Sequence, residues 1–347
     1  MDLEKRYHDV EAVLQTLDFD ALFAGFHKYS FAIYNSKEIC LDGKIIPYQE
    51  SFRGNTAIHY NGQYIAIWNL ELDPVDDIEV FAYLLVHEMF HCHQMAHGEK
   101  RYPADLILLN YPGDIDNFEK KYNENLYLAE SCENCDTEAF QKFAYIRNMR
   151  MKTYPDMVRQ ELRVETLEGT AEYVGLKALQ KINRKKFDEI IKKYLCKLRQ
   201  QDSLLFDIRR NSYYSGVLYY LCCDRNRMHV RNHFADEQTV YEQNPIAVDG
   251  KPVTIRHYAF IPALYAEFIG ERKKRIVECI EKWDYIACQS FICGYDPMNM
   301  FRVDTFIYCR YFVCLNKNGM IQTINTPVVL QLAENSNQDV IGYYCAK

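Results

Sequence analysis

Apolar positions follow a helical spacing at the start of the chain and a strand-like pattern after it. Residues 4–28 carry apolar side chains three and four positions apart, the spacing of an amphipathic helix. From about residue 31 to 70, β-prone runs replace this spacing, and Asn61-Gly62 between two of them is a strong hairpin signal. The sequence therefore predicts an N-terminal helix followed by the strands of a small sheet.

The next stretch predicts a long helix with a defined beginning and end. Asp73 is a good N-cap residue, and Pro74 suits the first helical position. Apolar residues then recur at helical spacing as far as Gly98, a typical C-terminal cap. We therefore expect residues 87–91 to lie on a helix.

Helices dominate the middle of the chain, and strands return at its end. Capping and periodicity predict helices near 117–132, 136–152, 155–182, 186–200 and 212–223, then a strand at 253–260 and a helix at 263–282. Asn318-Gly319 predicts another hairpin in the strand-rich remainder. The pattern of predicted elements changes between about 236 and 245, so we place the boundary between two domains there. We therefore predict an α+β fold, with a mixed sheet and a helical lobe over residues 1–240 and a strand-rich domain over residues 241–347.

The chemistry of the chain centres on an HExxH motif, which reads His87-Glu88-Met89-Phe90-His91. Residues four positions apart on a helix lie on one face, about one turn from each other. The imidazoles of His87 and His91 are therefore placed to share one tetrahedral Zn²⁺. Glu88 would point toward a zinc-bound water as the general base.

A catalytic zinc needs a third protein ligand, and the sequence offers two candidates. His97 stands ten residues after His87, in the register of the metzincin pattern HExxHxxGxxH. That pattern requires the helix to break at the position of Gln94, which is a good helix former. The other candidate is Glu168, which begins the stretch Glu-Gly-Thr-Ala-Glu-Tyr. We favour Glu168 over His97.

Residues 87–91 and 168–173 together resemble the gluzincins, the metallopeptidases that combine HExxH with a later Glu ligand. The resemblance implies that Glu168 is the third ligand and that the two motif helices face each other across the active-site cleft. Thermolysin-like members place an acid four residues after this ligand, which corresponds to Glu172, and use it to hold a zinc-binding His. Glu172 also lies one turn from Glu168, where a carboxylate that orients a ligand imidazole is expected. Glu165, one turn before Glu168, is a weaker candidate for that role.

The sequence also departs from familiar gluzincins, because a long helical insertion separates His91 from Glu168 and no GxMEN-type motif is present. An aminopeptidase specificity that depends on that motif is therefore not supported.

The oxyanion of a hydrolytic transition state needs a donor besides the metal. Gluzincins often use a Tyr or His that follows the third ligand. Tyr214 and Tyr213, near a predicted helix start, are the candidates here, with His229 and His233 less favoured. The resemblance also implies that extended substrate binds along an edge strand, for which the hairpin at 55–70 is the candidate.

Charge and composition narrow the class of partner. The net charge of −7 gives no basic surface for nucleic acid. No apolar run reaches the ~18 residues of a membrane span. The N-terminal stretch lacks the layout of a signal peptide, so we expect the thirteen cysteines to be reduced thiols of a cytoplasmic protein.

The sequence therefore predicts a zinc metallopeptidase that hydrolyses peptide or protein substrates by Glu-assisted attack of a zinc-bound water. Two alternatives stay open. One is a zinc hydrolase of another amide or acyl bond, which the same groups would serve. The other is a peptide-binding regulatory protein with a vestigial site.

Overall fold

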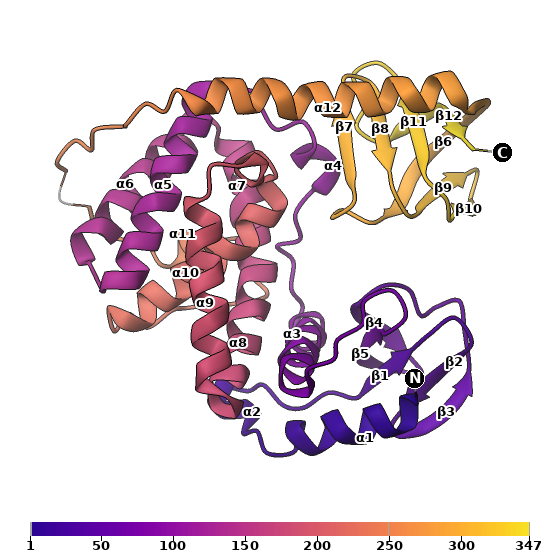
Figure 1. Cartoon of the computed structure of the whole chain (residues 1–347), viewed down its shortest axis with the longest axis horizontal. Coiled ribbons are helices and arrows are strands. Elements are labelled where there is room, and N and C mark those ends of the chain that lie inside the picture. Colours follow the sequence, from indigo (N-terminus) through magenta and orange to yellow (C-terminus); the bar gives the residue numbers. More distant parts are fainter. Residues whose placement is uncertain (1, 249, 347) are drawn as a thin grey trace.

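The computed structural model describes residues 2–248 and 250–346 and is a mixed α+β structure with two sheets and a large body of helices (Figure 1). The helical body and the N-terminal sheet lie on either side of the long helix α3 (Ile78–Ala96), and the second sheet is at the C-terminal end of the chain. A strand-rich C-terminal region was expected and is present. The predicted division at residue 240 stays a prediction. No helix within these ranges combines the length and the apolar character that a membrane crossing needs.

The N-terminal sheet is small and mixed. Its strands are β1 (Phe31–Tyr34), β2 (Glu38–Leu41), β3 (Lys44–Pro47), β4 (Thr56–Tyr60) and β5 (Gln63–Asn69), in the order β3-β2-β1-β5-β4. β1 and β5 run parallel, and the other pairs are antiparallel. Asn61 and Gly62 both have positive φ and form the predicted β4–β5 turn. β4 is last in this order, so it is an edge strand. Its neighbour β5 leads toward α3.

The first expected helix is shorter than predicted. α1 (Leu3–Leu14) ends well before residue 28, and a single turn, α2 (Phe19–Leu22), follows it. The side chain of Asp18 accepts a hydrogen bond from the backbone N–H of Ala21, which starts the new turn. This turn ends at Phe23, whose backbone is extended.

α3 begins later than predicted because another residue caps it. Asp77 accepts hydrogen bonds from the backbone N–H groups of Glu79 and Val80. Asp73 lies instead in the turn after β5, where its carbonyl accepts from the Trp68 indole N–H at 2.9 Å. The helix ends as predicted at Gly98, which has a φ of 74°.

Long helices form the body that faces α3. They are α5 (Ile115–Asn134), α6 (Thr137–Thr153), α7 (Pro155–Val164), α8 (Thr170–Ile182), α9 (Arg184–Arg199) and α10 (Ile208–Arg225); the short α4 (Asp105–Leu108) precedes them. The predicted continuous helix over 155–182 is interrupted by one π-helical turn, Glu165–Gly169. At this turn the backbone meets α10, because a Cβ built on Gly169 would lie only 2.7 Å from the Cα of Gly216.

Residues 253–260 form no strand, contrary to prediction. The backbone of Arg256 pairs with a side chain, Asn123, which donates to its carbonyl at 2.9 Å and accepts from its N–H at 3.2 Å. This exchange occupies the groups that a strand partner would need. The helix that follows is α12 (Phe260–Lys282), which runs from the helical body to the second sheet (Figure 1).

The C-terminal sheet has seven strands with antiparallel pairing throughout. They are β6 (Asp284–Tyr295), β7 (Met300–Val303), β8 (Phe306–Cys309), β9 (Val313–Lys317), β10 (Met320–Ile324), β11 (Val328–Leu332) and β12 (Asp339–Cys345), in the order β10-β9-β6-β12-β11-β8-β7. Asn318 and Gly319 form the predicted β9–β10 hairpin turn, again with positive φ. One face of the sheet packs against α12 through Ile276 and Cys279.

Candidate metal centre

Three side chains from two helices converge on one point. The Nε2 atoms of His87 and His91 are 3.0 Å apart, as expected for two residues one turn apart on α3. Glu168, from the π-helical turn, places its Oε2 3.3 Å from the Nε2 of His91 and 3.7 Å from that of His87. All three side chains are largely buried. The structure therefore gathers two imidazoles and a carboxylate into a single group.

The spacing of these atoms suits a tetrahedral ion. Zinc–nitrogen and zinc–oxygen bonds of about 2.0–2.1 Å at a tetrahedral angle separate two ligand atoms by roughly 3.3–3.4 Å. The three observed separations, 3.0, 3.3 and 3.7 Å, lie around this value. Two nitrogens and one oxygen are also a donor set that zinc takes in hydrolytic sites. The residues present therefore fit the metal that the motif predicts.

Each histidine is oriented by a partner on its other ring nitrogen. Glu172 Oε2 lies 2.9 Å from His87 Nδ1, and the Tyr194 hydroxyl donates to the other oxygen of Glu172 at 2.6 Å. A carboxylate oxygen accepts here and His87 donates from Nδ1, so Nε2 is the atom that would bind a metal once it is deprotonated. The structure thus brings Glu172 against the candidate ligand His87.

The partner of His91 was not predicted. Gln94 Oε1 lies 2.7 Å from His91 Nδ1, and Gln94 Nε2 donates to the carbonyl of Leu167 at 2.9 Å. The carbonyl accepts, so the amide nitrogen must face it and the amide oxygen must face His91. Gln94 therefore holds the His91 ring and also ties α3 to the turn that carries Glu168.

Arg209, on α10, is a second residue that sequence reasoning missed. Its Nη2 donates to Glu168 Oε1 at 3.0 Å, and its guanidinium also pairs with Asp105. Glu168 thereby presents its other oxygen, Oε2, to the two histidines. The only sequence signal is a basic residue near the start of a helix, which is too common to identify a role.

No family model, curated protein or solved structure matches this chain.

Electrostatics favour charge on all three candidate ligands. Burial alone would raise the pKa of Glu168, but the attraction of His91 and His87 holds it well below its usual value. Burial would lower the pKa of His87, but the nearby Glu168 and the hydrogen bond with Glu172 raise it well above its usual value. Because a metal binds the deprotonated imidazole, metal uptake by this group releases protons.

Glu88 differs from the other acids of the site. It is buried, and no hydrogen bond or ion pair joins it to another residue within the described ranges. Burial raises the pKa of its carboxyl group, and the nearby Glu168 and Glu172 add to this effect while the histidines oppose it. A buried carboxylate with a raised pKa and no fixed partner has the properties of a general base.

The two candidate tyrosines occupy different places. Burial, with the nearby charge of Glu168, raises the pKa of the Tyr213 hydroxyl well above the usual value. Tyr213 therefore remains a protonated donor beside the candidate ligands. Tyr214 instead packs edge-on against Tyr194, with ring centroids 4.8 Å apart.

The other sequence candidates lie outside the cluster. His97 caps the end of α3, its Nδ1 is 2.8 Å from the carbonyl of His93, and the helix does not break at Gln94. Glu165 faces away and pairs with Arg147, because the π-helical turn separates its direction from that of Glu168. Within the described residues, no hydrogen bond or ion pair joins His229 or His233 to the cluster.

Proposed function

We propose that the chain is a zinc-dependent peptidase of the gluzincin type, with His87, His91 and Glu168 as the metal ligands. The observation that carries the proposal is the ligand triangle, in which three atoms from α3 and the π-helical turn lie 3.0–3.7 Å apart. The unpaired carboxylate of Glu88 supports hydrolysis rather than structural metal binding, because a structural site needs no base.

Side chains of the protein carry out the proton transfers and stabilise the oxyanion. When bound, zinc supplies a Lewis acid that polarises a carbonyl and lowers the pKa of a water molecule. Glu88 accepts a proton from the attacking water and transfers it to the leaving amine. Tyr213, whose hydroxyl stays protonated, donates to the oxyanion that develops at the substrate carbonyl. Arg209 and Tyr194 hold Glu168 and Glu172 in place during these steps.

A peptide is the substrate class that the surroundings favour. β4 is an edge strand of the N-terminal sheet, and α3 packs against both β4 and β5. An extended peptide can add to such an edge through backbone hydrogen bonds. The close packing of α8 on α3 also supports a gluzincin-like arrangement, because a Cβ on Gly175 would lie 2.8 Å from the carbonyl of Tyr83. All thirteen cysteines are free, which favours a reducing compartment such as the cytoplasm.

The Glu88→Gln variant tests hydrolysis directly. We expect it to retain one zinc per chain and to cleave a peptide library about 10²–10⁴-fold more slowly than the wild type, because the base is lost and the ligands are kept. Glu79→Gln is the matched control, because Glu79 lies on the same helix and pairs with Lys186 far from the cluster. Its cleavage rate should equal that of the wild type.

The alternatives give different results in the same assay. A wild-type protein that hydrolyses another amide or acyl bond but no peptide would identify a different zinc hydrolase. Peptide binding without cleavage in the zinc-loaded wild type would identify a vestigial site and contradict the proposal.

A further inference from the structure

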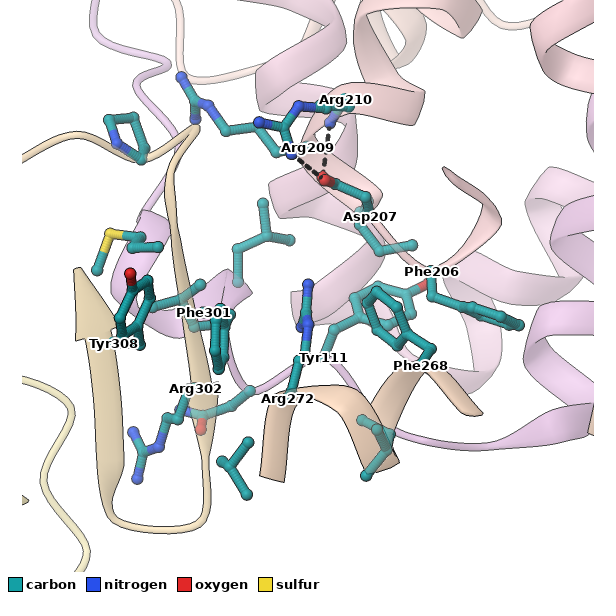
Figure 2. Close-up of a pocket in the computed structure, with 18 of the residues that line it drawn as sticks. Tyr111, Phe206, Asp207, Arg209, Arg210, Phe268, Arg272, Phe301, Arg302 and Tyr308 are labelled. Carbon is teal, nitrogen blue, oxygen red and sulfur yellow. Dashed lines mark hydrogen bonds and ion pairs between the residues drawn. The ribbon is translucent and has the colours of Figure 1, made fainter. Parts of the chain in front are cut away.

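A cavity of about 810 Å³ lies between the helical body and the C-terminal sheet (Figure 2). Its walls come from α4, α10, α12 and β7, so both halves of the molecule contribute to it. The volume is within the range of about 300–1,000 Å³ that is typical of small-molecule sites. It is separate from the histidines of the metal cluster, none of which lines it.

The lining of this cavity is strongly basic, although the chain as a whole carries a net charge of −7. Seven basic side chains line it against three acidic ones. Arg209 and Arg210 are neutralised by Asp105 and Asp207. The other five, Arg272, Lys273, Arg275, Arg302 and Arg310, form no ion pair with any residue in 2–248 or 250–346. The cavity therefore holds a surplus of positive charge that no described residue neutralises through an ion pair.

Arg272 is one of these unpaired basic side chains, and two aromatic rings hold it in place. Its side chain rises from α12 into the cavity between the rings of Phe268 and Phe301 (Figure 2). The guanidinium carbon lies 3.8 Å from the centroid of Phe268 and 5.1 Å from that of Phe301. Stacking fixes the guanidinium plane and leaves its N–H groups without an acceptor among the described residues. Burial lowers the pKa of Arg272 to about 10, so the group is still charged at neutral pH.

We propose that this cavity binds a small molecule that carries phosphoryl groups. A stacked guanidinium with free N–H groups matches the oxygens of a phosphate, to which it donates two parallel hydrogen bonds. A phosphoryl group carries a charge of about −1.5 to −2, so it offsets up to about two unpaired cations where one carboxylate offsets only one. The aromatic rings of Phe206, Phe301 and Tyr308 on the same walls suit an organic part of the ligand.

One side chain, that of Arg209, connects the cavity to the metal cluster. Arg209 lines the cavity and also donates to Glu168. An anion in the cavity therefore lies one residue away from the candidate metal ligand. The proposal itself stands on the cavity and its charges and does not depend on peptidase activity.

Isothermal titration calorimetry with inorganic pyrophosphate and with a nucleoside diphosphate tests the site on the full chain. We expect pyrophosphate to bind to the wild type and its affinity to fall about tenfold or more in Arg272→Gln and in Arg275→Gln, because each removes a charged donor. Lys274→Gln is the matched control, because Lys274 lies on the same helix, pairs with Glu278 and does not line the cavity. Its affinity should be that of the wild type.

The two probes and a further variant separate the outcomes. Equal affinity for both probes supports a site for the phosphate groups alone, and tighter binding of the nucleotide supports use of the aromatic walls. The absence of binding, or binding that Arg272→Gln and Arg275→Gln leave unchanged, would overturn the proposal. Binding that is lost only in His91→Ala would place the anion at the metal cluster and overturn it as well, whether or not the chain is a peptidase.

Discussion

Gln94 orients His91 from three residues further along the same helix. Its side chain joins the His91 ring to the backbone of Leu167, next to Glu168. Residues that hold the far nitrogen of a metal-binding histidine fix its tautomer and raise its basicity. Gln94 contacts the Nδ1 of His91 as Glu172 contacts that of His87, so each is positioned for this role.

Removing the Gln94 side chain should weaken metal binding without removing a ligand. We expect Gln94→Ala to lower zinc affinity by about 10–100-fold, because His91 loses its acceptor. Gln94→Glu keeps an acceptor at this position and should restore most of the affinity. Competition with a chelating dye measures both variants. An unchanged affinity in Gln94→Ala would show that the contact has no effect on the site.

Local spacing explains which site residues were predictable. His87, Glu88 and His91 follow one another on a helix, and Glu172 follows Glu168 by one turn, so helical geometry and one family resemblance were enough to single them out. Arg209 comes 41 residues after Glu168 and reaches it from another helix. Such a contact depends on how helices pack, and no spacing rule in the sequence encodes it.

The π-helical turn at Glu165–Gly169 is the element that places the third candidate ligand. It directs Glu168 toward the histidines and Glu165 toward Arg147. Gly169 and Gly216 let this turn touch the backbone of α10. Extra residues in a helical turn of this kind are frequent at functional sites.

A side chain at the crossing of these two segments should therefore be destabilising. We expect Gly169→Ala to lower the free energy of unfolding by about 1–3 kcal/mol, because the added Cβ meets backbone rather than a movable side chain. Gly270→Ala is the opposite case, because Gly270 lies in α12 with nothing within 4 Å of an added Cβ. It should stabilise the protein by up to about 1 kcal/mol through helix propensity. Urea titrations compare the two, and equal effects would contradict the close approach.

Cap and turn residues were enough to predict the other elements, and tertiary contacts explain where the predictions failed. Both Asn-Gly pairs form their hairpins because each places positive φ at two adjacent residues. The strand expected at 253–260 has β-prone residues but no neighbouring strand, since Asn123 takes the backbone groups of Arg256. Intrinsic preference was overridden by packing there.

A buried ionic network joins four helical segments of the whole molecule. Glu124 on α5 pairs with Arg147 and Arg150 on α6, which also bind Glu165 and Glu161. Burial raises the pKa of Glu124, but attraction to Arg147 and Arg150 outweighs it and holds the pKa well below its usual value. The unfolded chain therefore takes up a proton at Glu124 below about pH 4.3, where the folded chain does not. Stability that is present above this pH is lost as the pH falls.

Removing one member of this network should lower the free energy of unfolding even at neutral pH. We expect Glu124→Gln to lower the free energy of unfolding by about 3–5 kcal/mol, because two buried guanidinium groups each lose a partner. The variant should also lose stability less steeply than the wild type below about pH 4.3. Glu138→Gln, which breaks an exposed pair with Lys142 on α6, should change little. Similar losses in both variants, measured by urea titration across the pH range, would contradict this account.

The zinc content of the purified chain tests the central claim most directly. Wild type, Glu168→Ala and His97→Ala are compared after reconstitution with zinc and removal of the excess. The account predicts one zinc per chain in the wild type and in His97→Ala, and its loss in Glu168→Ala, because Glu168 lies 3.3 Å from His91 Nε2 while His97 faces the carbonyl of His93. Zinc that is retained in Glu168→Ala, or absent from the wild type, would contradict it.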